Sequence, residues 1–178
     1  MNKQIKNICI CSVAAALISV LSPISLPIGV ISVTLSLFII YTLAAILKPY
    51  QILIALLIYV IIGAIGLPVF SNFKGGISVL FGITGGYIVG YFPAVLIISF
   101  MVYKHKDKVY LYPISMIIGT VICYLIGTVW FVLIAQTTFT YALSVCVVPF
   151  IIFDLIKIAI ATIISYLINK KNLKIINE

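Results

Sequence analysis

The stretch Ala142–Ile168, ALSVCVVPFIIFDLIKIAIATIISYLI, decides the fold. It exceeds the roughly 20 residues that a helix needs to cross a bilayer. Its only charged residues are Asp154 and Lys157. The apolar run shows no period-two alternation, so it predicts a membrane-spanning helix, in which every backbone polar group finds a partner inside the segment.

The rest of the chain has the same character. Of its 178 residues, 65% are hydrophobic and 8% are charged, and the mean hydropathy is +1.37. This leaves too little polar surface for a water-soluble globule, so lipid is the expected solvent. Breaks at proline, glycine and charged clusters predict one all-α domain over residues 1–178, a bundle of six transmembrane helices at Ile8–Leu21, Val30–Leu47, Ile52–Leu67, Gly82–Tyr103, Pro113–Ala135 and Ala142–Ile168.

The lysines predict the orientation of this bundle. All 11 basic residues are lysine, and the net charge is +8. With six crossings and both termini in the cytoplasm, the outer loops receive only Lys74, and the inner side receives Lys3, Lys6, Lys48, Lys104, Lys106, Lys108, Lys170, Lys171 and Lys174. Merging the first two helices would scatter these charges over both sides. The pattern therefore predicts a multi-pass plasma-membrane protein, and the positive charge is not interpreted as nucleic-acid binding.

Asp154 and Lys157 are the most informative residues. A charge at the bilayer centre costs about 2.5–3.5 kcal/mol on insertion scales, so such residues normally face a cavity or a partner. Their i, i+3 spacing places them on one helix face, near mid-membrane, where they can pair and offer an acceptor beside a donor to a ligand. The alternative is a purely structural ion pair. A transporter, a proton path and an enzyme could each use the pair.

Glycines and small residues form three further patterns. Gly66–Tyr87 is a glycine-rich outer loop without a P-loop lysine, and its glycines suit either ligand contact or a tight chain reversal. Glycines recur at every fourth position from Gly82 to Gly90, which favours close helix packing over a ligand cavity. On the first helix, Ser12 and Ala16 form a small-xxx-small pair for helix packing or for a membrane partner.

Catalytic and metal chemistry has little support in the sequence. The four cysteines, Cys9, Cys11, Cys123 and Cys146, all lie in apolar runs and are interpreted as packing residues. His105 lies among lysines in a solvated loop. No nucleophile–base or metal-ligand arrangement is visible, so we expect neither an enzyme nor a bound metal.

Over nearly its whole length, the chain resembles the BioY type of biotin-binding S component from energy-coupling-factor (ECF) vitamin transporters. The Gly66–Tyr87 segment and the Asp-x-x-Lys pair are its most specific features. The matching motifs are Pro27-Ile28-Gly29, Val33-Thr34-Leu35, Ile65–Phe70, Gly75-Gly76, Gly82–Tyr87, Gly127–Trp130, and Val148-Pro149 followed by Asp154 and Lys157.

The resemblance implies a six-helix bundle with a biotin pocket open to the outside. It implies Asp154 and Lys157 as polar contacts to biotin, Tyr87 as an aromatic and hydroxyl contact, and Gly75 and Gly76 as part of a lid. The chemistry agrees: the ureido ring of biotin offers two N–H donors and a carbonyl acceptor, which suit a carboxylate beside an ammonium group. Its thiophane ring and valeryl chain call for apolar walls, which Tyr87 and Trp130 would supply.

Three positions depart from the family pattern. Lys74 stands where the family often has Asn, Ser36 where it often has Gln, and Ile83 where Pro is frequent. Lys74 would attract a vitamin carboxylate from outside, or it is only a loop charge.

The resemblance further implies import of biotin with a transmembrane coupling protein (the T component) and two ATPase subunits, since this chain has no nucleotide-binding motif. Ser12 and Ala16 match the small residues that the family offers to its membrane partner. Biotin is then the transported ligand, with no catalytic cofactor. The alternatives are an S component for another small vitamin, a transporter that works without ATPase subunits, and a small membrane enzyme.

Overall fold

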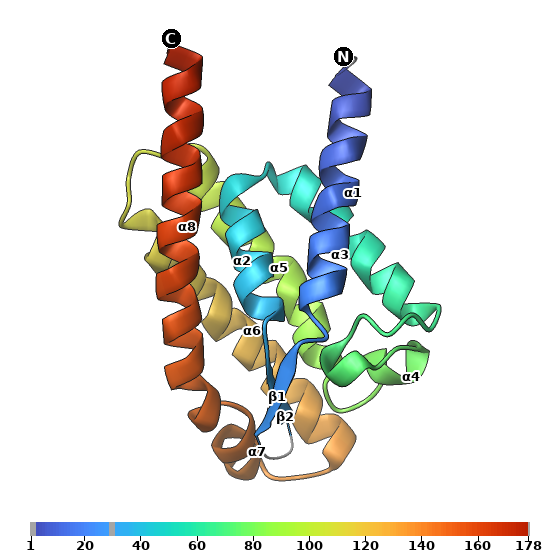
Figure 1. Ribbon diagram of the computed structural model, residues 1–178. Helices are drawn as coiled ribbons and strands as arrows, with labels where there is room; N and C mark the ends of the chain where they lie inside the picture. Colours follow the sequence, from blue (N-terminus) through green and yellow to red (C-terminus); the bar gives the residue numbers. More distant parts are fainter. Residues whose placement is uncertain (1–2, 29–30, 178) are drawn as a thin grey trace.

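The computed structural model describes residues 3–28 and 31–177, and they form a helical bundle with one small hairpin (Figure 1). In chain order the elements are α1 (Lys3–Leu21), β1 (Ser25–Ile28), β2 (Ile31–Thr34), α2 (Ser36–Ile46), α3 (Pro49–Ala64), the short 3₁₀ turn η1 (Ser71–Phe73), α4 (Ile77–Leu80), α5 (Gly85–Tyr103), α6 (Leu111–Ala135), α7 (Phe139–Cys146), the 3₁₀ turn η2 (Val148–Phe150) and α8 (Ile151–Asn177).

The longer helices run between two ends of the molecule. Both termini lie at one end, and the hairpin and α7 lie at the other (Figure 1). Among the described residues, four helical stretches are long and apolar enough to cross a membrane: Gln4–Leu21, Gly85–Tyr103, Leu111–Ala135 and Phe139–Lys171. Two apolar helices, α2 and α3, are shorter. This arrangement is that of a membrane protein.

The helix expected from Val30 to Leu47 begins only at Ser36, so this prediction was wrong in its first part. Residues 31–34 instead form β2, which pairs antiparallel with β1 so that Ser25 faces Thr34. Their β-branched composition explains the preference for a strand. Gly29 and Val30 lie outside the described residues. The 11 residues of α2 reach only about 16 Å, so the hairpin supplies the remaining length toward that end of the bundle.

The final apolar stretch is also not one continuous helix. The helical run is interrupted at Val147, where φ is −123° and ψ is −57°. Pro149, which lacks a backbone N–H, lies in the turn η2 that follows, and α8 begins at Ile151. Asp154 therefore lies in the first turn of α8 rather than in the middle of a helix. The partial positive charge of a helix N-terminus favours a carboxylate at this position. The other predicted boundaries differ from the observed ones by a few residues.

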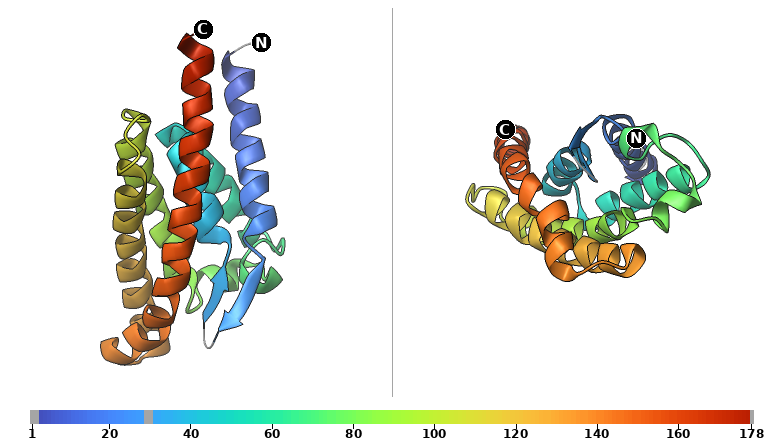
Figure 2. Two further views of the ribbon diagram at one scale, coloured as in Figure 1. Left: turned by 60° about the vertical axis from the view of Figure 1, so that its left-hand side comes forward. Right: turned by 90° about the horizontal axis from the view of Figure 1, so that it is seen from below.

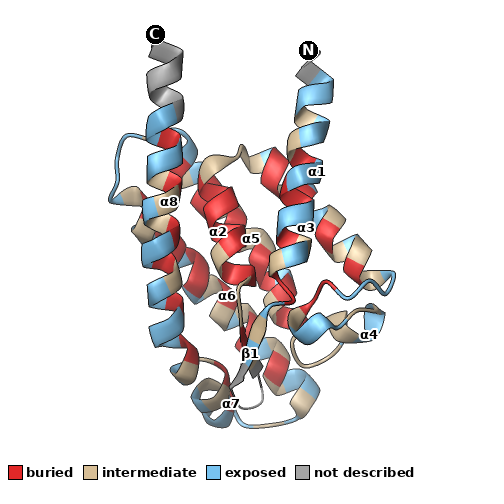
Figure 3. Cartoon of the chain, viewed as in Figure 1, coloured by how far each residue is buried: buried red, intermediate tan, exposed pale blue. Residues whose placement is uncertain are grey.

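The core surrounds α2, which packs against α1, α3, α5 and α8. Buried residues cover α2 and the inward faces of α3 and α5, whereas α1 and α8 carry long exposed strips (Figure 3). Viewed from the hairpin end, α1 and α8 stand on the outside of the bundle (Figure 2). Many of the exposed side chains are apolar, for example Val20 on α1 and Ile152 on α8. Such a surface suits contact with lipid.

Glycines bring α5 and α6 close together, as their four-residue spacing predicted. A Cβ atom at Gly86 would overlap Trp130, and one at Gly127 would overlap the ring of Tyr87. At Gly90 it would lie 3.1 Å from the Cα atom of Cys123. Gly82 precedes α5 and so is not part of this helix strip.

Side chains from three other segments cap the C-terminus of α2 at the end of the bundle where the termini lie. Asn169 of α8 donates from Nδ2 to the Ala45 carbonyl at 2.9 Å, and Ser99 of α5 donates to the Leu47 carbonyl at 3.0 Å. Lys106, in the α5–α6 loop, donates to the Ile46 carbonyl at 3.4 Å. Burial lowers the pKa of Lys106, and neighbouring Lys48 lowers it further. These bonds satisfy carbonyl groups that a helix end leaves without partners.

The packing of α5 on α6 predicts a measurable asymmetry between two glycines. Gly86→Ala should destabilise the protein by about 1–3 kcal/mol, because the added methyl group overpacks against Trp130. Gly119→Ala on α6 is the matched control: its Cβ atom would lie 3.2 Å from a terminal methyl group of Ile98, which can shift, and alanine favours the helix. Thermal unfolding in detergent measures both. Equal melting temperatures for the two variants would contradict this account of the helix contact.

Candidate functional site

A cavity of about 410 Å³ lies toward the hairpin end of the bundle. Its size falls within the range of about 300–1,000 Å³ that is usual for small-molecule sites. Most elements contribute to its wall, from β2 and α2 to the first turns of α8. The lining residues include Ser32, Ser36, Asn72, Lys74, Ile83, Tyr87, Tyr124, Asp154 and Lys157.

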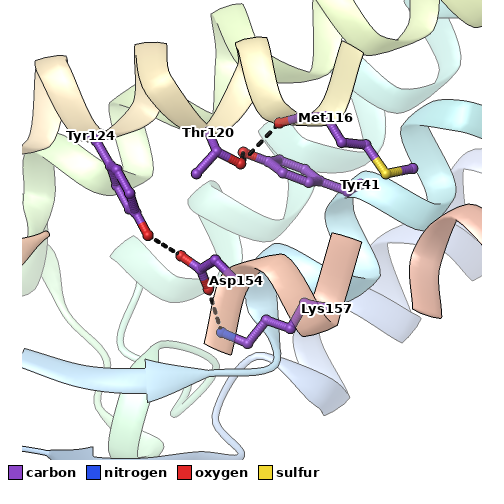
Figure 4. A network of polar contacts seen from close by, with 6 residues as sticks. All are labelled: Tyr41, Met116, Thr120, Tyr124, Asp154 and Lys157. Carbon is purple, nitrogen blue, oxygen red and sulfur yellow. Dashed lines mark hydrogen bonds and ion pairs between the residues drawn. The ribbon is translucent and has the colours of Figure 1, made fainter. Parts of the chain in front are cut away.

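The polar centre of the cavity is a set of three side chains (Figure 4). Lys157 Nζ lies 2.8 Å from Asp154 Oδ1, and both side chains are almost entirely buried, with 12% and 6% of their surface exposed. On the other side of the carboxylate, the Tyr124 hydroxyl reaches from α6 and donates to Oδ2 at 2.5 Å. The predicted contact between Asp154 and Lys157 is therefore confirmed, and Tyr124 joins it.

These contacts hold the Asp154 carboxylate in place without filling its hydrogen-bonding capacity. An ionised carboxylate offers about four acceptor positions, and the two protein donors use one on each oxygen. Acceptor positions therefore remain for a ligand N–H group. Because the donors and the helix terminus are already arranged, binding does not need to order them, which favours affinity.

A second polar contact fixes the helix that carries Tyr124. One turn before Tyr124 on α6, the Thr120 hydroxyl donates to the Met116 carbonyl at 2.8 Å. It also lies 3.1 Å from the hydroxyl of Tyr41 on α2 (Figure 4). This contact ties α6 to the buried helix at the centre of the bundle.

At the hairpin end of the cavity, Asn72 connects three segments. Its Nδ2 donates to Ser32 of β2 at 2.6 Å, and its Oδ1 accepts from Ser25 of β1 at 2.8 Å. Its backbone has φ 57° and ψ 35°, a left-handed conformation that Asn tolerates better than most residues. The side chain therefore joins the hairpin to the loop that follows α3.

Of the residues predicted to bind a ligand, Asp154, Lys157, Tyr87 and Lys74 line the cavity. Tyr87 also donates a hydrogen bond to the Cys146 carbonyl at 3.5 Å, linking α5 to α7. The lining also includes Ser36 and Ile83, the two other positions that depart from the family pattern.

Gly75, Gly76 and Trp130 are not among the lining residues, although they shape the structure around the cavity. A Cβ atom at Gly75 would overlap the Leu67 carbonyl, and Gly76 has φ 99° and donates from its backbone to the Gly63 carbonyl at 2.7 Å. Trp130 Nε1 donates to the Gly82 carbonyl at 2.9 Å. These residues fix the loop before α5 through backbone contacts.

Sequence reasoning did not single out Tyr124 or Asn72. Tyr124 is one of many tyrosines in apolar runs, and its link to a residue 30 positions away leaves no local pattern. Asn72 lies inside the glycine-rich loop and carries a weak signal of its own, since Asn is the residue most tolerant of left-handed turns after glycine.

The cysteines and His105 lie in different surroundings. Cys123 and Cys146 are buried and line the cavity, Cys11 is buried, and Cys9 is exposed. His105 lies exposed in the α5–α6 loop. Among the residues that the structure describes, no group of three His, Cys, Asp or Glu side chains could hold a metal ion.

An apolar bundle that encloses a medium-sized cavity, with one charged pair and tyrosines in its wall, defines a membrane protein that binds a small polar molecule. Comparison with known proteins shows the family to which the chain belongs. Residues 1–173 match the BioY family model, and the chain belongs to the BioY family.

Its relatives carry consistent names. The chain is 34% identical over 162 residues to biotin transporter BioY2 of Lactococcus lactis subsp. cremoris, covering 91% of this chain and 89% of that protein. It is 40% identical over 156 residues to biotin transporter BioY of Thermotoga maritima, covering 87% and 90%. Its fold resembles a crystal structure described as the S component for biotin from an ECF-type ABC transporter, with a TM-score of 0.87, 22% identity and coverage of 96% and 95%.

The ion pair predicts a coupling between its two members. Lys157→Met should destabilise the protein by about 1–3 kcal/mol, because it leaves a buried carboxylate with one donor fewer. Asp154→Asn combined with Lys157→Met should cost less than the sum of the single changes, with a coupling of about 0.5–3 kcal/mol. Unfolding in detergent for the four proteins of the cycle measures this. Strict additivity would show that the contact contributes nothing.

Proposed function

We propose that this protein captures biotin in the cavity and serves as the S component of an ECF-type transporter. The observation that carries the proposal is the position of the Asp154–Lys157 pair in the cavity wall of a BioY-family chain. The names of its relatives as biotin transporters support the choice of ligand.

The polar centre suits the ureido ring of biotin. One of its N–H groups meets a free acceptor position of Asp154, and its carbonyl oxygen accepts from Lys157, which has donors left after its bond to the carboxylate. The aromatic ring of Tyr87 then lies against the apolar part of the ligand. The proposed role of Gly75, Gly76 and Trp130 is indirect: they hold the loop segments that enclose the ligand.

The charges of the lining suit the carboxylate of biotin. Asp154 and Lys157 neutralise one another, whereas Lys74 is exposed, lines the cavity, and takes no part in the ion pair found among the described residues. The lining thus carries one excess positive charge, which complements a ligand with one negative charge. Lys74 would bind the carboxylate and set the direction in which biotin lies.

The proposed topology has six crossings, with both termini in the cytoplasm of a bacterial cell. α1, α2, α3, α5, α6 and α8 would be the crossing segments, with α2 extended by the hairpin. Both ends of the chain lie at the same end of the bundle (Figure 1), and the lysine-rich α5–α6 loop belongs to that end through its bond to α2. The excess of lysine there agrees with the rule that places positive loops in the cytoplasm.

The proposed partners are a transmembrane coupling protein and two ATPase subunits, which would supply the energy for import. One face of α1 is open for the coupling protein: Ser12 and Ala16 are exposed, while Ala14 and Ala15 are buried against the bundle. Small residues on an exposed helix face permit the close approach of another membrane helix.

Calorimetry of the purified protein in detergent tests the ligand. We expect tight binding of biotin, and a loss of about 2–4 kcal/mol in Asp154→Asn and Lys157→Met, because each leaves a buried partner unpaired. Asp107→Asn, in the exposed loop between α5 and α6, is the matched control and should bind as the unmodified protein does. Tight binding of another vitamin with none of biotin would reject the proposed ligand.

The role of Lys74 predicts a change in selectivity. Lys74→Gln should weaken binding of biotin about fivefold, the size of an exposed charge pair, while binding of biotin amide stays unchanged because this ligand has no carboxylate. Lys108→Gln, in a loop at the opposite end, serves as the control. An equal effect of Lys74→Gln on both ligands, at low salt, would show that Lys74 does not contact the carboxylate.

A further inference from the structure

A second hollow lies behind the polar centre of the cavity. It has a volume of about 390 Å³ and lies between α6, α7 and α8. Its lining is almost entirely apolar, and each of the three helices contributes one face to it. The lining includes Val121 and Leu125 from α6, Leu143 from α7 and Leu155 from α8. Val121, Leu125 and Leu155 are each about half exposed, so this crevice belongs to the outer surface of the bundle.

The ligand cavity and the outer crevice meet at Tyr124 and Asp154, the two residues that line both hollows. Asp154 itself is 5% exposed. The Tyr124 side chain extends from α6 across to the carboxylate at the start of α8, and its hydroxyl makes the bond that joins the two helices here (Figure 4). The ring of Tyr124 and its hydrogen bond to Asp154 therefore lie where the two hollows adjoin.

We propose that Tyr124 is a positioning residue with two separable effects on ligand binding. Its hydroxyl holds the Asp154 carboxylate in the orientation that accepts the ligand, and its ring limits the size of the ligand at this polar end. The proposal rests on the proposed function, which places the ureido ring against Asp154.

The size limit applies to a definite class of ligand. If the ureido ring lies against Asp154, a substituent on the ureido nitrogen that faces this carboxylate points toward Tyr124. With Tyr124 in place, the substituent meets the ring and also removes the N–H donor. Without the ring, the cavity joins the apolar crevice. A small substituent on this nitrogen, such as a methoxycarbonyl group, then gains room and apolar contacts. The residue thus discriminates free biotin from biotin that is acylated on the nitrogen facing Asp154.

Two substitutions separate the effects. Tyr124→Phe keeps the ring and removes the hydroxyl, so binding of biotin should fall about tenfold or more. Of N1′- and N3′-methoxycarbonylbiotin, the isomer whose substituent faces Asp154 should stay excluded. Tyr124→Ala removes both, so biotin should again bind more weakly, and the ratio of affinities should shift toward the substituted ligand by at least about tenfold. Calorimetry with biotin and both isomers measures the ratios.

Leu125→Ala is the matched control. Leu125 is the next residue on α6 and lines the crevice but not the cavity, so its truncation enlarges the crevice and leaves the separation intact. It should keep the selectivity of the unmodified protein. If Tyr124→Ala proves unstable in thermal unfolding, Tyr124→Leu, which also lacks the ring and the hydroxyl, takes its place with the same expected shift.

Unchanged selectivity in a folded Tyr124→Ala or Tyr124→Leu variant that still binds biotin would overturn the size limit. Unchanged affinity for biotin in Tyr124→Phe would overturn the effect on Asp154. Failure of the unmodified protein to bind biotin is a different result, and it would reject the proposed function itself.

Discussion

A carboxylate inside an apolar bundle is the constraint on which the rest of this structure depends. Removing an ion from water costs several kcal/mol unless well-placed partners compensate. Asp154 obtains three forms of compensation: the ammonium group of Lys157, the hydroxyl of Tyr124 and the N-terminus of α8. The third exists because the helical run is interrupted at Val147, between α7 and η2, so a new helix begins shortly before Asp154. The interruption of the last apolar stretch is therefore part of the site.

The same requirement explains the irregular backbone around the cavity. Backbone outside a helix survives at membrane depth only where it is paired or lines a polar space. The β1–β2 hairpin pairs the N–H and C=O groups that its two strands turn toward one another, and Ser32 and Thr34 of β2 line the cavity. At the opposite end, the short α2 ends inside the protein, and side chains of α5, α8 and the α5–α6 loop complete its last hydrogen bonds.

The sequence alone predicted the features that arise from local spacing and overall composition. The contact between Asp154 and Lys157 follows from an i, i+3 spacing, and the close packing of α5 on α6 follows from glycines four residues apart. The predicted start of α2 was wrong because an apolar run rich in β-branched residues is compatible with a membrane-spanning helix and with a buried strand. Tyr124 could not be found, because its role depends on how α6 faces α8, which is decided by tertiary packing. The ligand-binding roles predicted for Asp154, Lys157, Tyr87 and Lys74 stay predictions.

The Asn72 side chain ties together segments that line the hairpin end of the cavity. It bonds to both strands of the hairpin while belonging to the loop after α3, so three segments share one hydrogen-bonded junction. Separating the hairpin from the loop after α3 therefore requires breaking both bonds. The two segments are expected to move as one unit when either of them moves.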